Sequence, residues 1–253
     1  MTTVGDAHVS AVLDWWTANA RQLPWRQTRD VYAVWVSEVM LIQTQVERVE
    51  PAWRAWIDRW PTVTQLAAAS LADVLAQWQG LGYPRRARDL HRSARIVARC
   101  GWPEDLTALP GVGSYVDAAI RCFALEQAVL PIDVNVRRVL RRRFPGGVDS
   151  SADPWRTGQA LMEFGQRICA ARPHCGECPV NDDCVGVNAD PKRATPRAPR
   201  RFDGSLRQRR GQLLRQVIAD GAVPANDADP EAAAGLADDG LVIVSDGWLR
   251  APR

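Results

Sequence analysis

Four cysteines within sixteen residues are the feature of this chain that most directly implies chemistry. They are spaced C-x5-C-x2-C-x5-C and follow a helix-like run, Trp155 to Ile168. Four thiolates this close in sequence can hold a zinc ion or an iron–sulfur cluster. The cysteines are Cys169, Cys175, Cys178 and Cys184. The chain shows no membrane span and no secretory signal, so a reducing cytoplasm is expected, where such cysteines bind metal rather than form disulfides.

A glycine-containing turn upstream is the second chemical signal. The segment Leu109-Pro110-Gly111-Val112-Gly113 predicts a tight hairpin that opens into a helix at Ser114. Its glycines let the backbone approach a ligand closely, and the free N–H groups at the helix start favour an anion such as a DNA phosphate. Taken alone, the motif also fits an ordinary turn between helices.

Two carboxylates have surroundings that suit the acid and the anion by which glycosidases cleave a glycosidic bond. Glu38 lies within an apolar stretch, Val34 to Ile42, and burial there favours the raised pKa that suits a general acid. Asp133 precedes a predicted helix, Val134 to Phe144, where it caps the helix and stays ionised. Such cleavage requires an acid for the leaving base and an anion near the developing sugar cation. A structural carboxylate and a plain helix cap are the alternatives.

The remaining sequence predicts the elements that position these residues. Helical patterns cover the first 185 residues, with no convincing strand pattern, so this part is predicted to be all-α. The net charge is only +3, but the arginine run 137–143 fits a polyanionic partner or a solvated surface equally well. Residues 188–204 are rich in Pro and Arg and predict a basic linker. Residues 205–253 end in an Asp-Gly hairpin signal and predict a small winged-helix-like α+β module.

Several strings together resemble the helix-hairpin-helix DNA glycosylase superfamily. The hairpin motif, the string 131–139 around Asp133 and the four cysteines occur in that family's order. Three further strings are similar to the adenine DNA glycosylase (MutY) branch: Leu23-Pro24-Trp25-Arg26, Ser37 to Val46, and Gly80-Leu81-Gly82-Tyr83. The resemblance covers about residues 10–187, and the C-terminal module is similar to the short tail of actinobacterial members.

The resemblance implies a two-domain glycosylase region over residues 1–187. A six-helix core is expected at about 28–130, and a second helical domain in 1–27 and 131–168. The cluster loop is 169–184, followed by the linker 188–204 and the module 205–253. One [4Fe–4S] cluster on the four cysteines is the implied cofactor, with zinc as the alternative.

The implied function is removal of adenine mispaired with 8-oxoguanine or guanine in double-stranded DNA, by a monomer in the cytoplasm at the nucleoid. Glu38 matches the acid that protonates the flipped base, and Asp133 matches the carboxylate that stabilises the sugar cation. Gln43 and Tyr83 match residues that wedge into the duplex; a turn aromatic in the core is the alternative for Tyr83. The other matched DNA-contact or pocket positions are Arg26, Leu109, Gly111, Val112, Gly113, Ser114, Asn135 and Glu163.

Tyr115 decides the expected type of reaction. Lyase-type relatives similar to endonuclease III carry a lysine at this position, which attacks the sugar and forms a Schiff base. The single lysine of this chain is Lys192, so a lysine Schiff base within the catalytic region is impossible. Only the N-terminal amine or Lys192 could substitute, so a monofunctional glycosylase that leaves an abasic site is expected.

Departures from the family pattern keep two other functions open. The first cysteine interval is five residues where the family has six, and only 35 residues separate Asp133 from Cys169. Ile42 replaces the second wedge glutamine, and residues 188–253 are too short for the Nudix-like domain that reads 8-oxoguanine in many members. A thymine or uracil glycosylase acting on G mismatches is the main alternative. A DNA-binding cluster protein without catalysis is the other.

Overall fold

The computed structural model describes residues 4–182, 184–186 and 202–252, with side chains from residue 7 onward. Contacts divide the chain into two compact units. The first consists of Met1–Trp35 and Gly113–Pro196, and the second of Val36–Val112 and Arg197–Arg253. Most of the predicted basic linker, 188–204, lies outside the described residues. The domain boundaries expected from the sequence stay a prediction.

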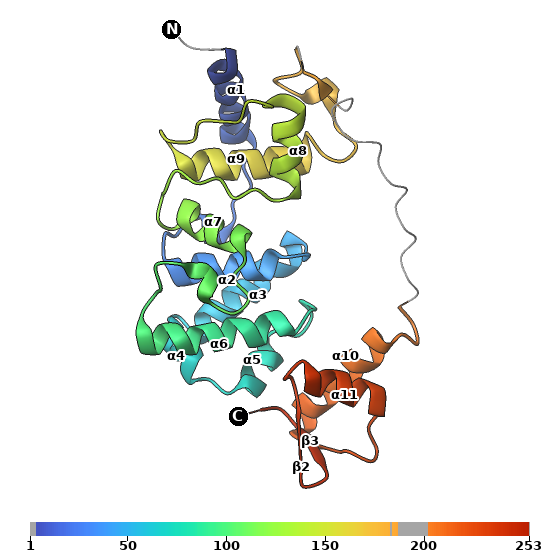
Figure 1. The fold of residues 1–253 in the computed structure, drawn as a ribbon. Helices are drawn as coiled ribbons and strands as arrows, with labels where there is room; N and C mark the ends of the chain where they lie inside the picture. The colour runs from blue at the N-terminus through green and yellow to red at the C-terminus, as the bar shows by residue number, and fades with distance from the viewer. Residues whose placement is uncertain (1–3, 183, 187–201, 253) are drawn as a thin grey trace. The chain divides into compact units, whose positions relative to one another are not determined.

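The first unit is built around α9 (Pro154–Arg167), which packs against three other helices (Figure 1). Asp153 caps α9 by accepting a hydrogen bond from the Arg156 amide, and Pro154 occupies the first turn, where its missing N–H costs nothing. The other elements of this unit are α1 (Val4–Asn19), η1 (Pro24–Arg26), the start of α2 (Val31–Leu41), α7 (Ser114–Phe123), α8 (Val134–Arg143) and η3 (Cys175–Glu177).

Residues 36–112 of the second unit are helical, and two short helices, α4 (Val63–Ala68) and α5 (Leu71–Gln77), pack against α6 (Arg85–Cys100). Side chains cap two of these helices, since Thr62 and Gln65 form a capping box and Ser70 accepts from the Asp73 amide. The other elements are the end of α2, α3 (Val46–Arg59) and η2 (Leu106–Ala108).

The C-terminal module, residues 202–252, combines two helices with a small antiparallel sheet. The chain order is α10 (Leu206–Asp220), β1 (Val223–Pro224), α11 (Pro230–Asp238), β2 (Ile243–Ser245) and β3 (Trp248–Arg250). The strand order is β1-β3-β2, and the predicted Asp-Gly hairpin turn joins β2 to β3 with both residues at positive φ. The predicted small α+β module with its hairpin is confirmed, and its likeness to a winged helix stays a prediction.

The structure also confirms the predicted all-α character of the glycosylase region. Every strand among the described residues lies within the C-terminal module. No helix of the described part of the chain has the length and apolar character needed to cross a membrane.

Candidate functional site

Glu38 lies on α2 in the second unit, with a residue exposure of 2%. Its chain neighbours Val36, Val39 and Met40 are 0–3% exposed. The apolar stretch seen in the sequence is therefore buried, and it places a carboxyl group in the low-dielectric surroundings that a general acid requires.

Asp133 caps α8 in the first unit, as predicted. Its Oδ1 accepts hydrogen bonds from the amides of Asn135 (2.8 Å) and Val136 (2.7 Å), and its Oδ2 accepts one from the Asn135 side chain (2.7 Å). Three donors therefore fix both oxygens of a half-buried carboxylate. We call the assembly of Asp133, Asn135, Arg138 and Gly165 the Asp133 corner.

Asn135, which donates to Asp133, is itself held by Arg138 and by close packing against Gly165. The Asn135 amide oxygen accepts from Arg138 (2.7 Å), which also donates to the carbonyls of Gly165 (2.6 Å) and Cys169 (2.7 Å). A Cβ at Gly165 would lie 2.9 Å from the Asn135 carbonyl oxygen. Gly165 therefore permits α9 to approach the start of α8 more closely than any other residue type would.

The predicted hairpin forms a tight turn at Leu109–Val112, and α7 begins at Ser114, as expected. Gly111 has φ +78°, and a Cβ there would lie 2.9 Å from the Asp89 Cβ, so glycine is required. Gly113 caps α7 without a side-chain acceptor among the described residues. The first N–H groups of α7 therefore suit an anion. Tyr115 is half-buried in the first turn of α7.

Gln43 and Tyr83 lie in two turns of the second unit. Both have left-handed backbone, with φ +55° at Gln43 and +49° at Tyr83. Gln43 is exposed and Tyr83 is 46% exposed. Left-handed backbone is uncommon for residues other than glycine and stores strain, often at functional sites. We call residues 42–44 and 80–83 the wedge turns.

Arg86 joins both wedge turns to the end of α2. Burial lowers the pKa of its guanidinium to about 10, so it stays charged at neutral pH. It donates six hydrogen bonds of 2.6–3.1 Å. The acceptors are the carbonyls of Val39, Met40, Ile42, Leu81 and Gly82 and the Thr44 hydroxyl. One side chain thus ties the helix that carries Glu38 to the turns that carry Gln43 and Tyr83.

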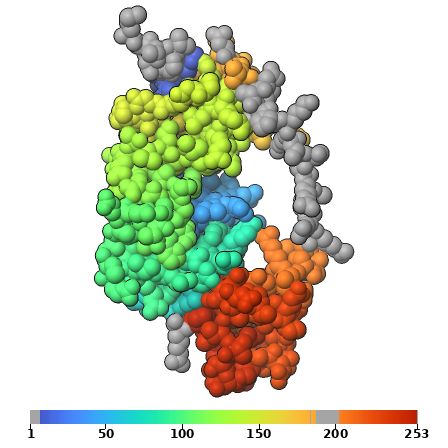
Figure 2. Space-filling model, in the orientation of Figure 1, coloured from blue at the N-terminus to red at the C-terminus, as the bar shows by residue number. Residues whose placement is uncertain are grey.

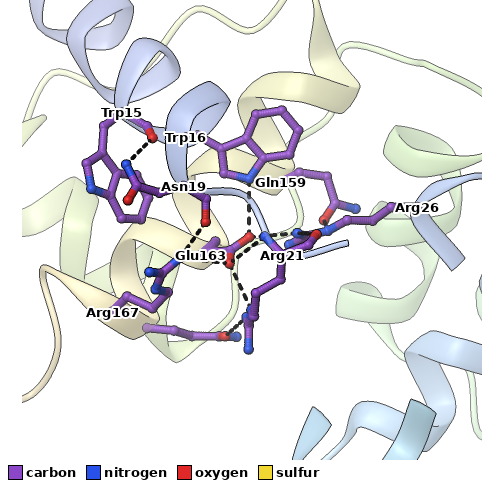
Figure 3. A network of polar contacts seen from close by, with 9 residues as sticks. Trp15, Trp16, Asn19, Arg21, Arg26, Gln159, Glu163 and Arg167 are labelled. Carbon is purple, nitrogen blue, oxygen red and sulfur yellow. Dashed lines mark hydrogen bonds and ion pairs between the residues drawn. The ribbon is translucent and has the colours of Figure 1, made fainter. Parts of the chain in front are cut away.

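Arg26 and Glu163 form a buried ion pair in the first unit (Figure 3). The Glu163 side chain is 0% exposed, and it accepts from Arg26 (2.6 Å), Arg21 (2.8 Å) and the Trp16 indole (3.3 Å). Burial raises its pKa, but the charges of Arg26 and Arg21 outweigh that effect, so the pKa lies below its ordinary value. The network joins the N-terminal segment to α9, and Arg26 also donates to Gln159 (2.7 Å).

The four predicted ligand cysteines follow α9, and two of them receive N–H donors. Arg142 donates to Cys169 Sγ (3.6 Å), and the Gly186 amide donates to Cys184 Sγ (3.3 Å). Burial raises the pKa of Cys178, and the charges of the other three thiols raise it further.

The four sulfurs are close enough for their charges to interact, but they do not surround a common point at metal-ligand distance. Within the described ranges, no three His, Cys, Asp or Glu side chains lie close enough to hold a metal ion, which needs sulfur at about 2.3 Å. The charges of Cys169, Cys175 and Cys184 still act on Cys178, because an electrostatic interaction extends over a longer distance than a metal–sulfur bond. Four neighbouring thiols, two of which accept from N–H donors, have the chemistry that a thiolate-bound metal or cluster needs.

Sequence reasoning did not identify Arg86. Arg85 and Arg86 are adjacent in the sequence, but the Arg85 side chain is 63% exposed whereas Arg86 is half-buried. The available signal was its position in the first turn of a helix, three residues after Tyr83, where a long donor can reach back to the preceding turn.

Comparisons with known proteins identify the family. Residues 36–165 match the model described as HhH-GPD superfamily base excision DNA repair protein. The adenine DNA glycosylase of Mycolicibacterium smegmatis is 40% identical over 241 residues, which cover 86% of this chain and 82% of that protein. The adenine DNA glycosylase of Mycobacterium tuberculosis is 41% identical, covering 84% and 80%.

Solved structures show the same fold. A structure described as a thermostable thymine-DNA glycosylase has a TM-score of 0.63 and 25% identity, covering 70% of this chain and 94% of that one. The chain therefore belongs to the HhH-GPD superfamily of base excision DNA repair proteins and, within it, to the adenine DNA glycosylase family.

Proposed function

We propose that this protein removes adenine mispaired with 8-oxoguanine or guanine from double-stranded DNA. The observation that carries the proposal is 40% identity to an adenine DNA glycosylase over 86% of the chain. Identity to the thymine-DNA glycosylase structure is 25% over 70% of the chain. The difference favours adenine over thymine or uracil as the excised base.

Glu38 and Asp133 are the proposed catalytic residues. In the proposed reaction the bond between the sugar C1′ and the base nitrogen breaks, and its electron pair goes to the base. Glu38 donates a proton that makes the base a better leaving group, and the Asp133 carboxylate stabilises the positive charge left on the sugar. Water then adds to C1′ and releases a proton, which gives the abasic site. The burial of Glu38 and the three donors on Asp133 support these roles.

The reaction is proposed to stop at the abasic site. A lyase of this superfamily type needs an amine to attack C1′, and no lysine precedes Lys192. Tyr115 stands at the matching position in the first turn of α7, and a phenol cannot form a Schiff base. The product should therefore be cut only after alkali is added.

We propose that turns and the N-terminal ends of helices make the contacts with DNA. The hairpin 109–113 and the start of α7 at Ser114 would bind a phosphate through backbone N–H groups. Gln43 and Tyr83 would enter the duplex and offset part of the few kcal/mol that base extrusion costs. Asn135 would contact DNA next to Asp133, and the Arg26–Glu163 pair would border the adenine pocket. The protein is proposed to act as a monomer near the nucleoid.

The four cysteines, Cys169, Cys175, Cys178 and Cys184, are proposed to hold one [4Fe–4S] cluster. When bound, such a cluster supplies a fixed charge and a structural cross-link rather than bond-breaking chemistry. The N–H donors from Arg142 and Gly186 to two of the sulfurs support the proposal.

The test is single-turnover base release from a panel of duplexes, with alkali added to reveal abasic sites. The panel pairs A with 8-oxoguanine, G and T, and pairs T or U with G. We expect adenine release, fastest opposite 8-oxoguanine. Glu38→Gln should lower the rate by about 10²-fold to 10⁴-fold. Glu50→Gln, on the exposed side of α3, is the matched control and should keep the rate.

Three results would contradict parts of the proposal. Release of T or U with adenine untouched would assign the chain to the mismatch glycosylases. Retained activity in folded Glu38→Gln would remove that residue from catalysis. Strand cleavage before alkali, by a preparation free of other lyases, would show that the reaction does not stop at the abasic site.

A further inference from the structure

The C-terminal module contacts the helices on both sides of the Gly80–Pro84 turn. Its α10 packs against α5, which precedes the turn. At the end of α11, the Asp239 carbonyl accepts a hydrogen bond from Arg88, and the Asp239 carboxylate lies 3.5 Å from Arg85. Both arginines belong to α6, which follows the turn, and a cation at a helix C-terminus is favourable. Figure 2 shows the orange-to-red module lying against the teal segment that carries the turn.

A cavity of about 140 Å³ separates the turn from the helix that docks beside it. Trp78, Gly80 and Pro84 line the turn side, and Leu214 and Ile218 of α10 line the other. Open space therefore borders the turn on the side that faces α10.

Tyr83 lies close to two guanidinium groups. The Arg86 guanidinium carbon is 5.5 Å from the centre of the Tyr83 ring, and the Arg207 carbon is 5.2 Å from it. Arg86 belongs to the same segment as Tyr83, whereas Arg207 is in the first turn of α10 in the module. Arg207 and much of the Tyr83 ring are exposed.

We propose that the C-terminal module is a positioning element for Tyr83, and that Arg207 holds the tyrosine ring in the orientation from which it enters DNA. The inference rests on the wedge function proposed above. A cation–π contact between exposed groups is weak, which suits a ring that must be oriented before binding and released into the duplex afterwards. The docking contacts of Asp239 and α10 keep Arg207 in place.

The experiment uses the full chain and two measurements. The first is the single-turnover rate of adenine release at saturating enzyme. The second is the fluorescence of 2-aminopurine placed at the target adenine, which reports base extrusion. Arg207→Ala should lower both by about 2-fold to 5-fold, and Arg207→Lys, which keeps the cation, should restore most of the loss. Arg209→Ala is the matched control on the same helix, because its ion pairs with Asp229 and Glu231 lie within the module.

A double-mutant comparison decides whether Arg207 acts through Tyr83. In a Tyr83→Ala background, Arg207→Ala should have no further effect on either measurement. An equal loss in both backgrounds would overturn the proposal, as would no loss in the wild-type background. Weaker DNA binding with a smaller salt dependence, and unchanged extrusion at saturating enzyme, would identify a phosphate contact instead. If the wild type releases no adenine, the proposed function fails, and the 2-aminopurine measurement still decides this inference.

Discussion

The Asp133 corner and the wedge turns are constructed in opposite ways. Asp133 has ordinary helix-cap geometry and is fixed by three hydrogen bonds and by the close approach at Gly165. Gln43 and Tyr83 have strained, left-handed backbone, and Arg86 holds their turns. A group that stabilises developing charge gains from being fixed in advance. A group that enters the duplex must be able to change conformation, and stored strain makes that change less costly.

The two regions also differ in how their charges are balanced. The helix that carries Gly165 is anchored by Glu163, a buried carboxylate paired with arginines. Arg86 instead donates to carbonyl and hydroxyl oxygens, without a carboxylate among its described hydrogen-bond partners. Acid should therefore weaken the support of the Asp133 corner before it affects the wedge turns.

Removing the charge of Glu163 should have the largest effect on stability. Its lowered pKa means that its contribution is complete above the unfolded value, about 4.3, and is lost as pH falls through the lower folded pKa. Glu163→Gln should lower the free energy of unfolding at neutral pH by about 3–5 kcal/mol and flatten its decline in acid. Glu126→Gln, which breaks an exposed pair with Arg29, should cost less than about 1 kcal/mol. Equal losses in urea unfolding would contradict this prediction.

Replacing Arg86 tests the wedge turns directly. Arg86→Lys keeps a cation but loses the planar fork that reaches six acceptors. We expect a loss of about 2–3 kcal/mol in stability and a loss of base extrusion. Arg92→Lys, on the exposed side of the same helix, should be neutral in both measurements. Unchanged extrusion in Arg86→Lys would show that the turns do not depend on this side chain.

A methyl group at Gly165 tests whether the corner must be fixed. Gly165→Ala places a Cβ 2.9 Å from the Asn135 carbonyl oxygen, so α8 and α9 must separate, at about 1–3 kcal/mol. Base release should fall with stability because Asp133 moves with Asn135. A Cβ at Gly146 meets open space, so Gly146→Ala should change neither property. Full base release by Gly165→Ala would show that the corner tolerates displacement.

Relieving strain at Gln43 is the smallest and most specific test of the comparison. Gln43→Gly suits the left-handed backbone there and should stabilise the protein by about 1 kcal/mol while reducing base extrusion. Asp246→Gly, at φ +52° in the hairpin of the C-terminal module, should stabilise without that reduction. Both variants should have a higher melting temperature, but only Gln43→Gly should reduce base extrusion. Identical extrusion in the two variants would contradict this prediction.

The amino-acid sequence predicted more of the Asp133 corner than of the wedge turns, because the features of the corner depend more on residues that are close in sequence. The Asp133 cap and the glycines of the hairpin follow from residue type and position, because each acts on backbone within a few residues. Gly165 matters only because α8 lies against it, and the sequence of α9 alone cannot show that. Arg86 differs from Arg85 only in burial, which depends on three segments meeting. The unit boundary at Trp35 falls inside α2, where helical periodicity continues without interruption.

The first unit is assembled from two separate parts of the chain, which has a consequence for synthesis on the ribosome. The Trp16 indole bonds to Glu163, 147 residues later. At about 5–20 residues per second, that partner emerges roughly 7–30 s after the indole does. Residues 36–112 emerge within this interval and can fold before it ends, while Val12 and Trp16 still lack the helix against which they are buried. The buried face of the N-terminal helix therefore stays uncovered on the nascent chain until α9 has been made.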